Sequence, residues 1–392
     1  MNSRVTGLTL SILDAISEVP AAAWDALLAH EPDRASPFVR HAFLAAAEES
    51  GCATARHGWR PRHLVLRRGR EVVAAAPAYA RQSSDGDFGR DWEWAAAAGR
   101  ARLPYYPKLV LGVPFTPATG RRLLVASGED RAALGRALLE GARALCADEG
   151  IHGVHVLFPG AEEAQELAAA GFALRVDFQY HWTNDGYRGP EEFLARFPSK
   201  RRNTIKRERA APGAQGIAIR TVRGEELAQD PAGWAQACFA LHRATTDRMD
   251  WGMRFVNRAF YERVMRGLPD AVEVVEARRA GELVAMAFNL ASPAVLYGRY
   301  WGCGEDHPFL HFNVALYHSI DECIRRGVQR FEGGAGGEHK LSRGFQPAET
   351  WSAHLFLERR LDEAIRRHLE AERADRLGAV ARWRGEHTRL GG

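Results

Sequence analysis

The chain has 392 residues, of which 46% are hydrophobic and 26% charged, and its formal net charge is +4. This balance is typical of a globular protein of about two domains, and so small a net charge does not indicate a nucleic-acid binder. No stretch approaches the ~20 apolar residues of a membrane-spanning helix, the first twenty residues lack the pattern of a signal peptide, and we expect a cytoplasmic protein. The five scattered cysteines form no C-x-x-C pair, which argues against a disulfide framework and a cysteine-based zinc site.

The first predicted elements occur twice along the chain. Ser36–Gly51 and Met253–Gly267 share the spacing F-V-R/N-x-A-F at the start of a helical pattern. Each is followed by two strand-like runs around a turn, at residues 62–80 and 271–291, which predict β-hairpins.

The elements that follow repeat as well. Each half continues with a strand and then an amphipathic helix, Arg131–Gly150 in the first and His311–Gly327 in the second. Both predicted helices end in glycine, the usual residue just past a helix. Residues 152–182 and 328–356 then each predict a strand, a short element and a further strand. A repeat of this length predicts a duplicated domain rather than a solenoid, whose unit has ~20–50 residues.

The repeated order sets the predicted domain limits. We expect an N-terminal domain at 1–189, a basic helical connection at 190–216, a C-terminal domain at 217–358 and a charged C-terminal helix at 359–392. The last helix has a thin apolar stripe, which is typical of a surface helix packed along one side or at a subunit contact.

Several long phrases resemble those of one protein family. Tyr105–Leu124 (YYPKLVLGVPFTPATGRRLL), Tyr300–Val314 (YWGCGEDHPFLHFNV) and Phe331–His354 are similar to the signature blocks of the FemAB-like predicted N-acyltransferases, which are linked to peptidoglycan biosynthesis or recognition. Arg201–Ala210 (RRNTIKRERA) resembles the phrase that opens the second domain of Fem aminoacyl transferases. The resemblance covers nearly all of residues 30–357.

The resemblance implies an α/β (α+β) fold of two tandem GNAT-like acyltransferase domains with mixed, splayed central sheets. It also implies transfer of an acyl or aminoacyl group onto an amine acceptor, in peptidoglycan-related metabolism. Such a reaction needs a neutral amine, a positioned carbonyl and a stabilised oxyanion, and no metal or tightly bound cofactor. Acyl-CoA or aminoacyl-tRNA is the expected donor, and a muropeptide-like or other small amine the expected substrate.

The glycine-rich segment Arg330–Phe345 (RFEGGAGGEHKLSRGF) is the main candidate site. Its order fits neither the Walker motif nor G-x-G-x-x-G, which argues against those nucleotide loops. The backbone amides at Gly336 and Gly337 could receive an anion, or the glycines could only let a strand end splay. Lys340 and Arg343, three residues apart on a helical face, are predicted to clamp a phosphate or carboxylate.

The same segment supplies candidate bases, since Glu332, Glu338 and His339 all carry groups able to accept a proton. Histidine has the intrinsic pKa best matched to neutral pH. The first half has no matching glycines and no His-Lys pair, so we expect the site in the second half.

Histidines and aromatic residues around the second amphipathic helix form a further group. The spacing of His307 and His311 is compatible with a metal site, but few carboxylates could complete it, and we predict no metal. His311 and Trp301 are instead expected to contact substrate, or His311 to act as a buried cap. Asp250 and Trp251, at a predicted helix end, are weaker candidates.

In the first half an aromatic-rich segment precedes a rare lysine, since the chain has four lysines among 53 basic residues. Tyr105 and Lys108, with Trp92, Trp94 and Tyr106, could line a cleft that stacks a sugar or base. The alternative is a rigid packed loop.

The basic segment Lys200–Arg209 holds six cations in ten residues. It could be a solvated helix face, or it could contact tRNA or another anionic surface. The Q/R-x-x-G-x-G/A loop with which GNAT enzymes bind CoA is missing from both halves, where only Gly120 remains. This departure favours an aminoacyl donor, and it leaves a non-catalytic muropeptide-recognition module and a CoA-dependent N-acetyltransferase as alternative functions.

Overall fold

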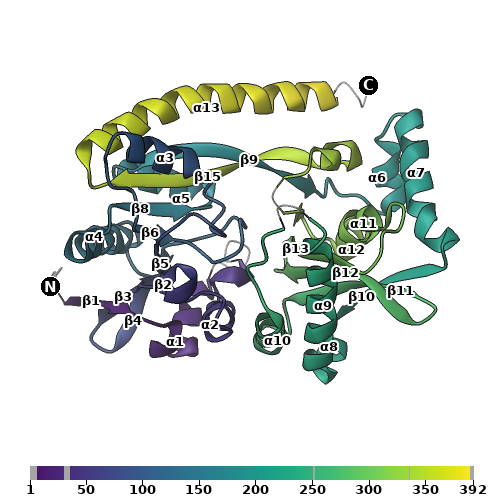
Figure 1. Cartoon of the computed structure of the whole chain (residues 1–392), viewed down its shortest axis with the longest axis horizontal. Helices are drawn as coiled ribbons and strands as arrows, with labels where there is room; N and C mark the ends of the chain where they lie inside the picture. Colours follow the sequence, from purple (N-terminus) through teal and green to yellow (C-terminus); the bar gives the residue numbers. More distant parts are fainter. Residues whose placement is uncertain (1–6, 31–35, 250–251, 335, 389–392) are drawn as a thin grey trace. The chain divides into compact units, whose positions relative to one another are not determined.

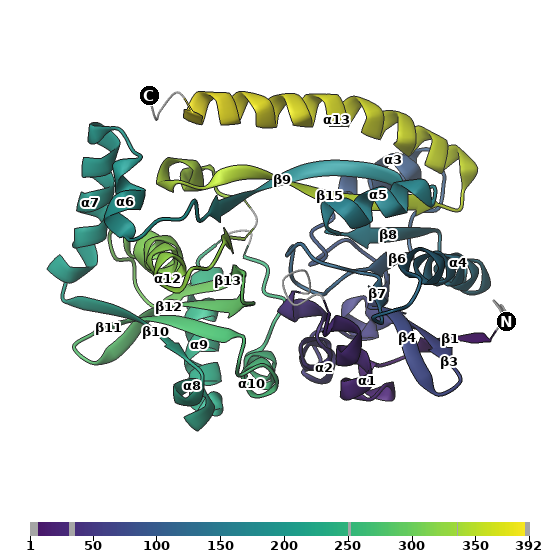
Figure 2. The ribbon, with the colours of Figure 1, turned by 180° about the vertical axis from the view of Figure 1, so that it is seen from behind.

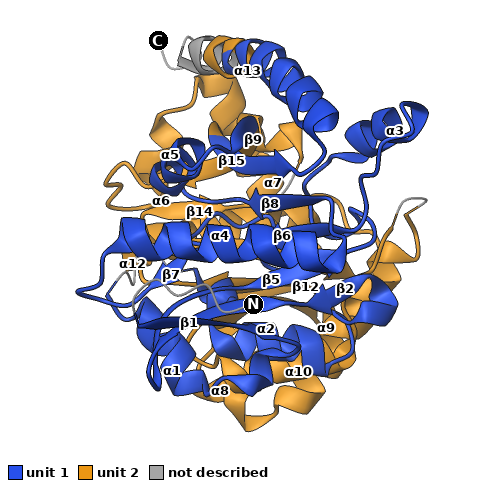
Figure 3. Ribbon diagram, turned by 90° about the vertical axis from the view of Figure 1, so that its left-hand side faces the viewer, with its two compact units in different colours: residues 1–177, 349–377 blue, residues 178–348, 378–392 orange. Residues whose placement is uncertain are grey.

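The computed structural model describes residues 7–30, 36–249, 252–334 and 336–388. The chain forms two compact units, which Figure 3 shows in different colours: unit 1 comprises residues 1–177 and 349–377, and unit 2 comprises residues 178–348 and 378–392. The sequence-based limits treated each domain as continuous, with a change after residue 189, whereas each unit combines two separate segments of the chain. Asp250 and Trp251 lie outside the described residues.

Unit 1 contains two sheets and the long helix α4. Its elements, labelled in Figures 1 and 2, are β1 (Leu8–Leu13), α1 (Ala21–Asp25), α2 (His41–Glu49), β2 (Trp59–Pro61), β3 (His63–Arg68), β4 (Glu71–Ala76), β5 (Ala78–Arg81), α3 (Trp92–Arg100), β6 (Lys108–Leu111), β7 (Leu124–Val125), α4 (Arg131–Glu149), β8 (Gly153–Leu157) and α5 (Ala161–Ala169). One sheet has the order β1-β3-β4-β7. In the other, β2, β5 and β6 are antiparallel and β6 pairs in parallel with β8.

Unit 2 contains the second copy of the repeated order of helices and strands. Its elements are α6 (Pro190–Ala195), α7 (Ser199–Ala214), β10 (Ile217–Arg223), α8 (Glu225–Gln229), α9 (Pro231–Thr246), α10 (Arg258–Gly267), β11 (Val272–Arg279), β12 (Glu282–Ala291), β13 (Val295–Cys303), α11 (Leu310–Phe312), a π-helix (Asn313–Tyr317), α12 (His318–Arg326), β14 (Arg330–Glu332) and a 3-10 helix (Glu338–Arg343). Strands β10 to β13 are antiparallel, and β13 pairs in parallel with β14. Helices α9 and α10 cover one face of this sheet and α11 to α12 the other (Figures 1 and 2).

Local signals placed several elements correctly. The hairpin predicted at 271–291 is β11 and β12, joined by Ala280 and Gly281, both with positive φ, as a tight two-residue turn requires. The predicted helix ends are confirmed, since Gly150 after α4 and Gly327 after α12 both adopt the left-handed conformation.

Two strands pair with strands that lie far from them in the sequence. Strand β9 (Ala173–Thr183) contributes His181–Thr183 to unit 2, where they pair with β14. Strand β15 (Gln346–Phe356) contributes Ser352–Phe356 to unit 1, where they pair with β8. Strand β9 begins in unit 1 and its last residues extend the sheet of unit 2. Strand β15 begins in unit 2 and its last residues extend the sheet of unit 1.

The C-terminal segment forms one long helix, α13 (Arg359–Thr388), as predicted. It buries Leu361, Ile365 and Leu369 in an apolar cluster of unit 1, on the thin stripe expected from the sequence. Among the described residues, no helix combines the length and the apolar character needed to cross a bilayer.

Candidate active site

The candidate site of unit 2 lies where two parallel strands part. The ladder between β13 and β14 covers three pairs and ends at Tyr297 and Glu332, whereas β13 runs on to Cys303. Opposite β12 the register shifts between Asn289–Gly298 and the next pair, so that Arg299 bulges out of the ladder at this point. The bulge and the early end of β14 leave the inner edge of β13 open toward the glycine-rich segment.

The glycine-rich segment turns sharply after β14. Gly334, Gly336 and Gly337 have φ between +74° and +89°, a region that residues with a Cβ rarely adopt. Gly334 also packs closely on β13, because a Cβ there would lie 3.3 Å from the carbonyl oxygen of Gly298. These glycines bring the 3-10 helix to the open edge of β13, and a role of Gly336 and Gly337 in binding substrate stays a prediction.

Lys340 points back into this turn. Its side chain is 5% exposed, and Nζ donates hydrogen bonds to the carbonyl oxygens of Gly334 (2.9 Å) and Gly336 (2.8 Å). Burial, together with the nearby Arg299, lowers the pKa of Lys340 to about 8. Both partners are neutral carbonyls, so the ammonium keeps its full charge and has a third N–H to donate.

Arg343 is buried beside Lys340, but a carboxylate neutralises its charge. Its Nη2 donates to Glu208 of α7 at 2.8 Å, and its Nη1 to the carbonyl oxygen of His339 at 2.8 Å. The guanidinium also stacks on Phe312, 3.4 Å from the ring centroid, and Glu208 accepts a further hydrogen bond from the Tyr317 hydroxyl at 2.5 Å. The role of Arg343 as an anion clamp stays a prediction, and the ion pair with Glu208 leaves this buried cation less charge for a ligand.

His339, His311, Trp301 and Phe312 form an aromatic cluster next to Lys340. The ring centroids of His311 lie 5.0 Å from Trp301 and 5.9 Å from His339, and that of Phe312 lies 5.3 Å from His339. Burial lowers the pKa of His311 to about 4 and also lowers the pKa of His339. Both imidazoles are therefore neutral at pH 7, and a contact of the exposed His339 with substrate stays a prediction.

The carboxylates of the segment lie in different surroundings. Glu332, at the last ladder position of β14, is 3% exposed and lies 3.1 Å from Arg330 Nε, whereas Glu338 is exposed. Of the predicted bases, Glu332 is placed better than Glu338, because it lies where β14 ends and separates from β13.

Three residues near the site were missed by sequence reasoning. Glu208 lies inside a run of cations, Arg299 lies in the middle of a strand, and His181 comes from a strand predicted in the other half. The bulge that presents Arg299 is a property of strand register, for which a single sequence carries little signal.

In unit 1 Tyr105 and Lys108 are held in a buried network. Lys108 is fully buried, and its Nζ contacts Asp87 (2.9 Å), Asp91 (2.6 Å) and Ser84 (2.7 Å). The Tyr105 hydroxyl donates to Asp91 at 2.6 Å. Neither side chain is accessible to a ligand in this structure, which favours the packed-loop alternative for these two residues, and their contact with substrate stays a prediction.

Helix α7 uses its basic residues in two ways. Three of the six cations make hydrogen bonds or ion pairs within unit 2: Arg201, Arg202 and Arg209. The other three are exposed: Lys200, Lys206 and Arg207. Contact with an anionic partner stays a prediction, and it concerns the exposed set.

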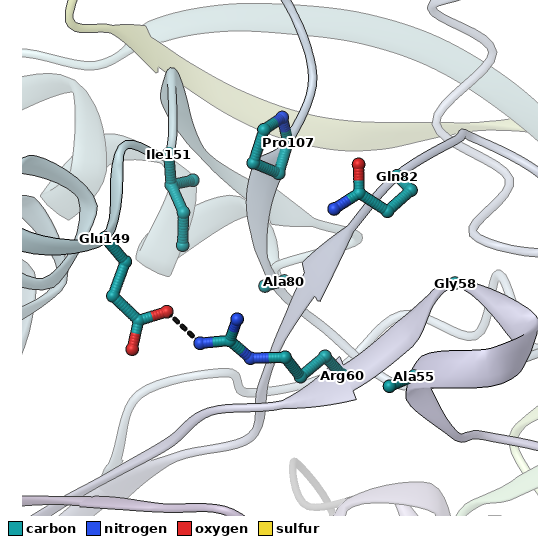
Figure 4. A pocket seen from close by; sticks show the side chains of 8 residues that line it. All are labelled: Ala55, Gly58, Arg60, Ala80, Gln82, Pro107, Glu149 and Ile151. Atoms are coloured by element: carbon teal, nitrogen blue, oxygen red, sulfur yellow. Dashed lines mark hydrogen bonds and ion pairs between the residues drawn. The ribbon is translucent and has the colours of Figure 1, made fainter.

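Two remaining features lie apart from this site. Among the described residues, no cluster of three or more His, Cys, Asp or Glu side chains is placed to hold a metal ion. A small pocket in unit 1, shown in Figure 4, is bordered by an ion pair between Arg60 and Glu149. None of the predicted site residues lines this pocket.

Comparisons with known proteins agree with the fold. The FemAB-like family model, described as peptidoglycan biosynthesis/recognition, matches residues 15–388. The crystal structure of FemX is 12% identical with a TM-score of 0.52, over 89% of this chain and 98% of FemX. A tandem GNAT protein from the clavulanic acid biosynthesis pathway is 15% identical with a TM-score of 0.46, over 89% of this chain and 98% of its own. A conserved protein of unknown function from Bacteroides thetaiotaomicron is 12% identical with a TM-score of 0.49, over 89% and 100%. No curated protein matches the chain.

The likeness to FemX concerns the fold alone at this identity. Together with the mixed sheets described above, it confirms the predicted fold of two tandem GNAT-like domains.

Proposed function

The chain belongs to the FemAB-like family, and we propose that it is an N-acyltransferase that moves an acyl or aminoacyl group onto an amine at the candidate site of unit 2. The observation that carries the proposal is the parting of β13 and β14 with Glu332 at the last shared pair and Lys340 turned back into the same turn. A carboxylate that can take a proton and an ammonium that can stabilise an anion are the two groups that amide formation needs most.

The acceptor enters as an ammonium and must lose a proton before its nitrogen can attack. The Glu332 carboxylate takes this proton, so that an N–H bond breaks and an O–H bond forms. The free amine then attacks the acyl carbonyl of the donor, and negative charge develops on the carbonyl oxygen. The remaining N–H of Lys340 Nζ stabilises this oxygen, because its other two hydrogen bonds go to neutral carbonyls. The tetrahedral intermediate collapses to the new amide, the bond to the leaving group breaks, and the second amine proton leaves with that group.

The open edge of β13 supports binding of an extended substrate. Backbone groups beyond Tyr297 continue past the ladder with β14 and can pair with an extended chain, as in strand addition. The family description suggests a peptidoglycan precursor as the acceptor. The missing CoA loop and the neutralised Arg343 favour an aminoacyl donor over a CoA thioester, and the exposed cations of α7 would meet the phosphates of an aminoacyl-tRNA.

The test is amide formation by the purified protein with a panel of acyl-CoA and aminoacyl-tRNA donors and peptidoglycan-precursor amines, read by mass spectrometry. Glu332→Gln and Lys340→Met should each lower the rate at least about 100-fold, the scale of losing a general base or an oxyanion donor. Glu282→Gln and Arg279→Met, on the exposed β11–β12 turn, serve as matched controls. Binding of a muropeptide without turnover across the panel would favour the recognition function instead.

A further inference from the structure

The first turn of helix α7 contacts the backbone of the 3-10 helix. Arg201 Nε donates a hydrogen bond to the carbonyl oxygen of Ser342 at 2.6 Å. Ser342 lies one residue before the end of the 3-10 helix, and the last carbonyl groups of a helix have no partner within it. Basic side chains commonly bond such carbonyls. Arg201 is therefore a C-terminal cap of the 3-10 helix that comes from a different helix.

Helix α6 packs against the same end of the 3-10 helix. Gly344, which follows the 3-10 helix, has a φ of +93°, and a Cβ there would lie 2.6 Å from the ring of Phe193 in α6. Two backbone hydrogen bonds close this end, since the amide of Gly344 donates to Leu341 and the amide of Phe345 donates to Lys340, both at 3.2 Å. Contacts from α6 and α7 thus converge where the 3-10 helix ends.

Lys340 lies within the closed end. Its carbonyl oxygen accepts the hydrogen bond from Phe345, while its Nζ donates to the carbonyl oxygens of Gly334 and Gly336. A 3-10 helix of six residues has few internal hydrogen bonds, and their geometry is poorer than in an α-helix. The place of Lys340 therefore depends on contacts from outside the helix, and Arg201 supplies one of them.

We propose that Arg201 is a positioning residue, which holds the end of the 3-10 helix through the Ser342 carbonyl and thereby keeps the Lys340 ammonium in its turn. The inference rests on the proposed function only for the oxyanion that this ammonium stabilises. Arg201 is partly exposed and its acceptor is a neutral carbonyl, so removing the guanidinium leaves no buried charge without a partner. Replacing Arg201 therefore loosens the end of the 3-10 helix while the unit stays folded.

The first test needs no substrate and uses Arg201→Gln. Hydrogen exchange, read by mass spectrometry on the peptide that contains Gly344 and Phe345, should become about tenfold faster, the scale of one hydrogen bond to a charged group. The pKa of Lys340, read as the midpoint of its acetylation by acetic anhydride, should rise from about 8 toward the ordinary 10.5. The reason is that a loosened turn admits water to the ammonium, which relieves the effect of burial.

Arg202→Gln is the matched control for both measurements. Arg202 is the next residue of α7, and its Nη1 donates to the carbonyl oxygen of Phe197, which lies outside the 3-10 helix. The control loses the same charge and a bond to the same kind of acceptor, so exchange and the Lys340 midpoint should stay at their wild-type values. Wild-type exchange and an unmoved midpoint in Arg201→Gln would overturn the positioning role, and so would equal changes in the control.

The second test uses the transfer reaction. In Arg201→Gln kcat should fall about tenfold with KM nearly unchanged, because Lys340 acts on the charge that develops in the transition state. Arg201→Lys keeps a donor for the Ser342 carbonyl and should restore part of kcat. A loss confined to KM, or no rescue by lysine, would contradict the inference. If no donor is turned over, the proposed function fails, whereas exchange and the Lys340 midpoint still decide the role of Arg201.

Discussion

The ion pair between Glu208 and Arg343 is predicted to hold the 3-10 helix, and with it Lys340, in place. The two side chains are each 6% exposed and 2.8 Å apart. Glu208 also accepts from Tyr317, and its backbone carbonyl accepts from Asn313 Nδ2 at 2.8 Å, so that α7, the π-helix and the glycine-rich segment meet at one carboxylate. Replacing Glu208 by Gln keeps the shape but leaves Arg343 as an uncompensated buried cation.

The expected magnitude follows from these contacts. Removing one partner of a buried ion pair costs about 3–5 kcal/mol. Gln can still accept from Arg343 and Tyr317, so Glu208→Gln should lie near the lower end, about 3 kcal/mol. Glu208→Ala loses those hydrogen bonds as well and should cost about 1 kcal/mol more. In the double variant Glu208→Gln/Arg343→Met no charge is stranded and the thioether can still pack on Phe312, so its loss should be smaller than that of Glu208→Gln alone.

Urea and thermal unfolding of the wild type, of the single variants Glu208→Gln and Arg343→Met and of the double variant measure this coupling. For a unit of this size about 3 kcal/mol corresponds to a fall in Tm of about 6–12 °C. Transfer activity at a temperature where Glu208→Gln remains folded should also fall, because the 3-10 helix loses its anchor. The reasoning is refuted if Glu208→Gln lies within 1 kcal/mol of the wild type, or if the two single losses simply add in the double variant.

Three further predictions concern the lysines. Lys340, with its pKa lowered to about 8 by burial, should be acetylated by acetic anhydride, which releases acetate, with a midpoint near pH 8 instead of the ordinary 10.5, as read by mass spectrometry against Lys340→Met. Between pH 8 and 10.5 the unfolded chain still binds the proton that the folded protein has released, so stability should rise with pH from this group. Lys108→Met should destabilise unit 1 by about 3–5 kcal/mol in urea unfolding, because two buried carboxylates lose their cation; a loss below 1 kcal/mol would show that the network is not ionised. Lys200→Gln and Lys206→Gln, on the exposed face of α7, should weaken binding of a tRNA and reduce its salt dependence by about one unit of slope per cation, with equal slopes speaking against contact there.

Local signals predicted most of the fold. The turn of residues 280–281, the glycines that end α4 and α12, and the repeated order of elements all depend on neighbours in the chain, which a sequence displays directly. The pairing of His181 with Glu332 depends instead on which strand completes which sheet, a choice made between segments about 150 residues apart. A largely buried strand looks the same in either unit, so the sequence pattern of β9 could not decide between them.

The sequence shows which residues of the candidate site are neighbours, but it does not show how their charges are paired. The glycines and Lys340 stand together in the sequence, and the structure brings them together. Glu208, in contrast, was read as one residue of a basic run, although it is the one whose charge cancels that of Arg343. A single acid among cations gives no local sign of being buried, because its partners Tyr317 and Arg343 come from segments more than 100 residues away.

The surroundings of the two buried lysines are our reason for proposing the reaction in unit 2. Lys108 contacts two carboxylates, which raise its pKa against the effect of burial and leave the cluster without free positive charge. Lys340 is buried as well, but its partners are backbone carbonyls, which orient the ammonium without cancelling it. An oxyanion that forms next to Lys340 gains a charge-assisted hydrogen bond, whereas one next to Lys108 would compete with Asp87 and Asp91. The two lysines differ in the type of their partners, which are carbonyls for Lys340 and carboxylates for Lys108. Among the described residues, the glycine-rich turn of unit 2 provides the carbonyls that accept hydrogen bonds from Lys340.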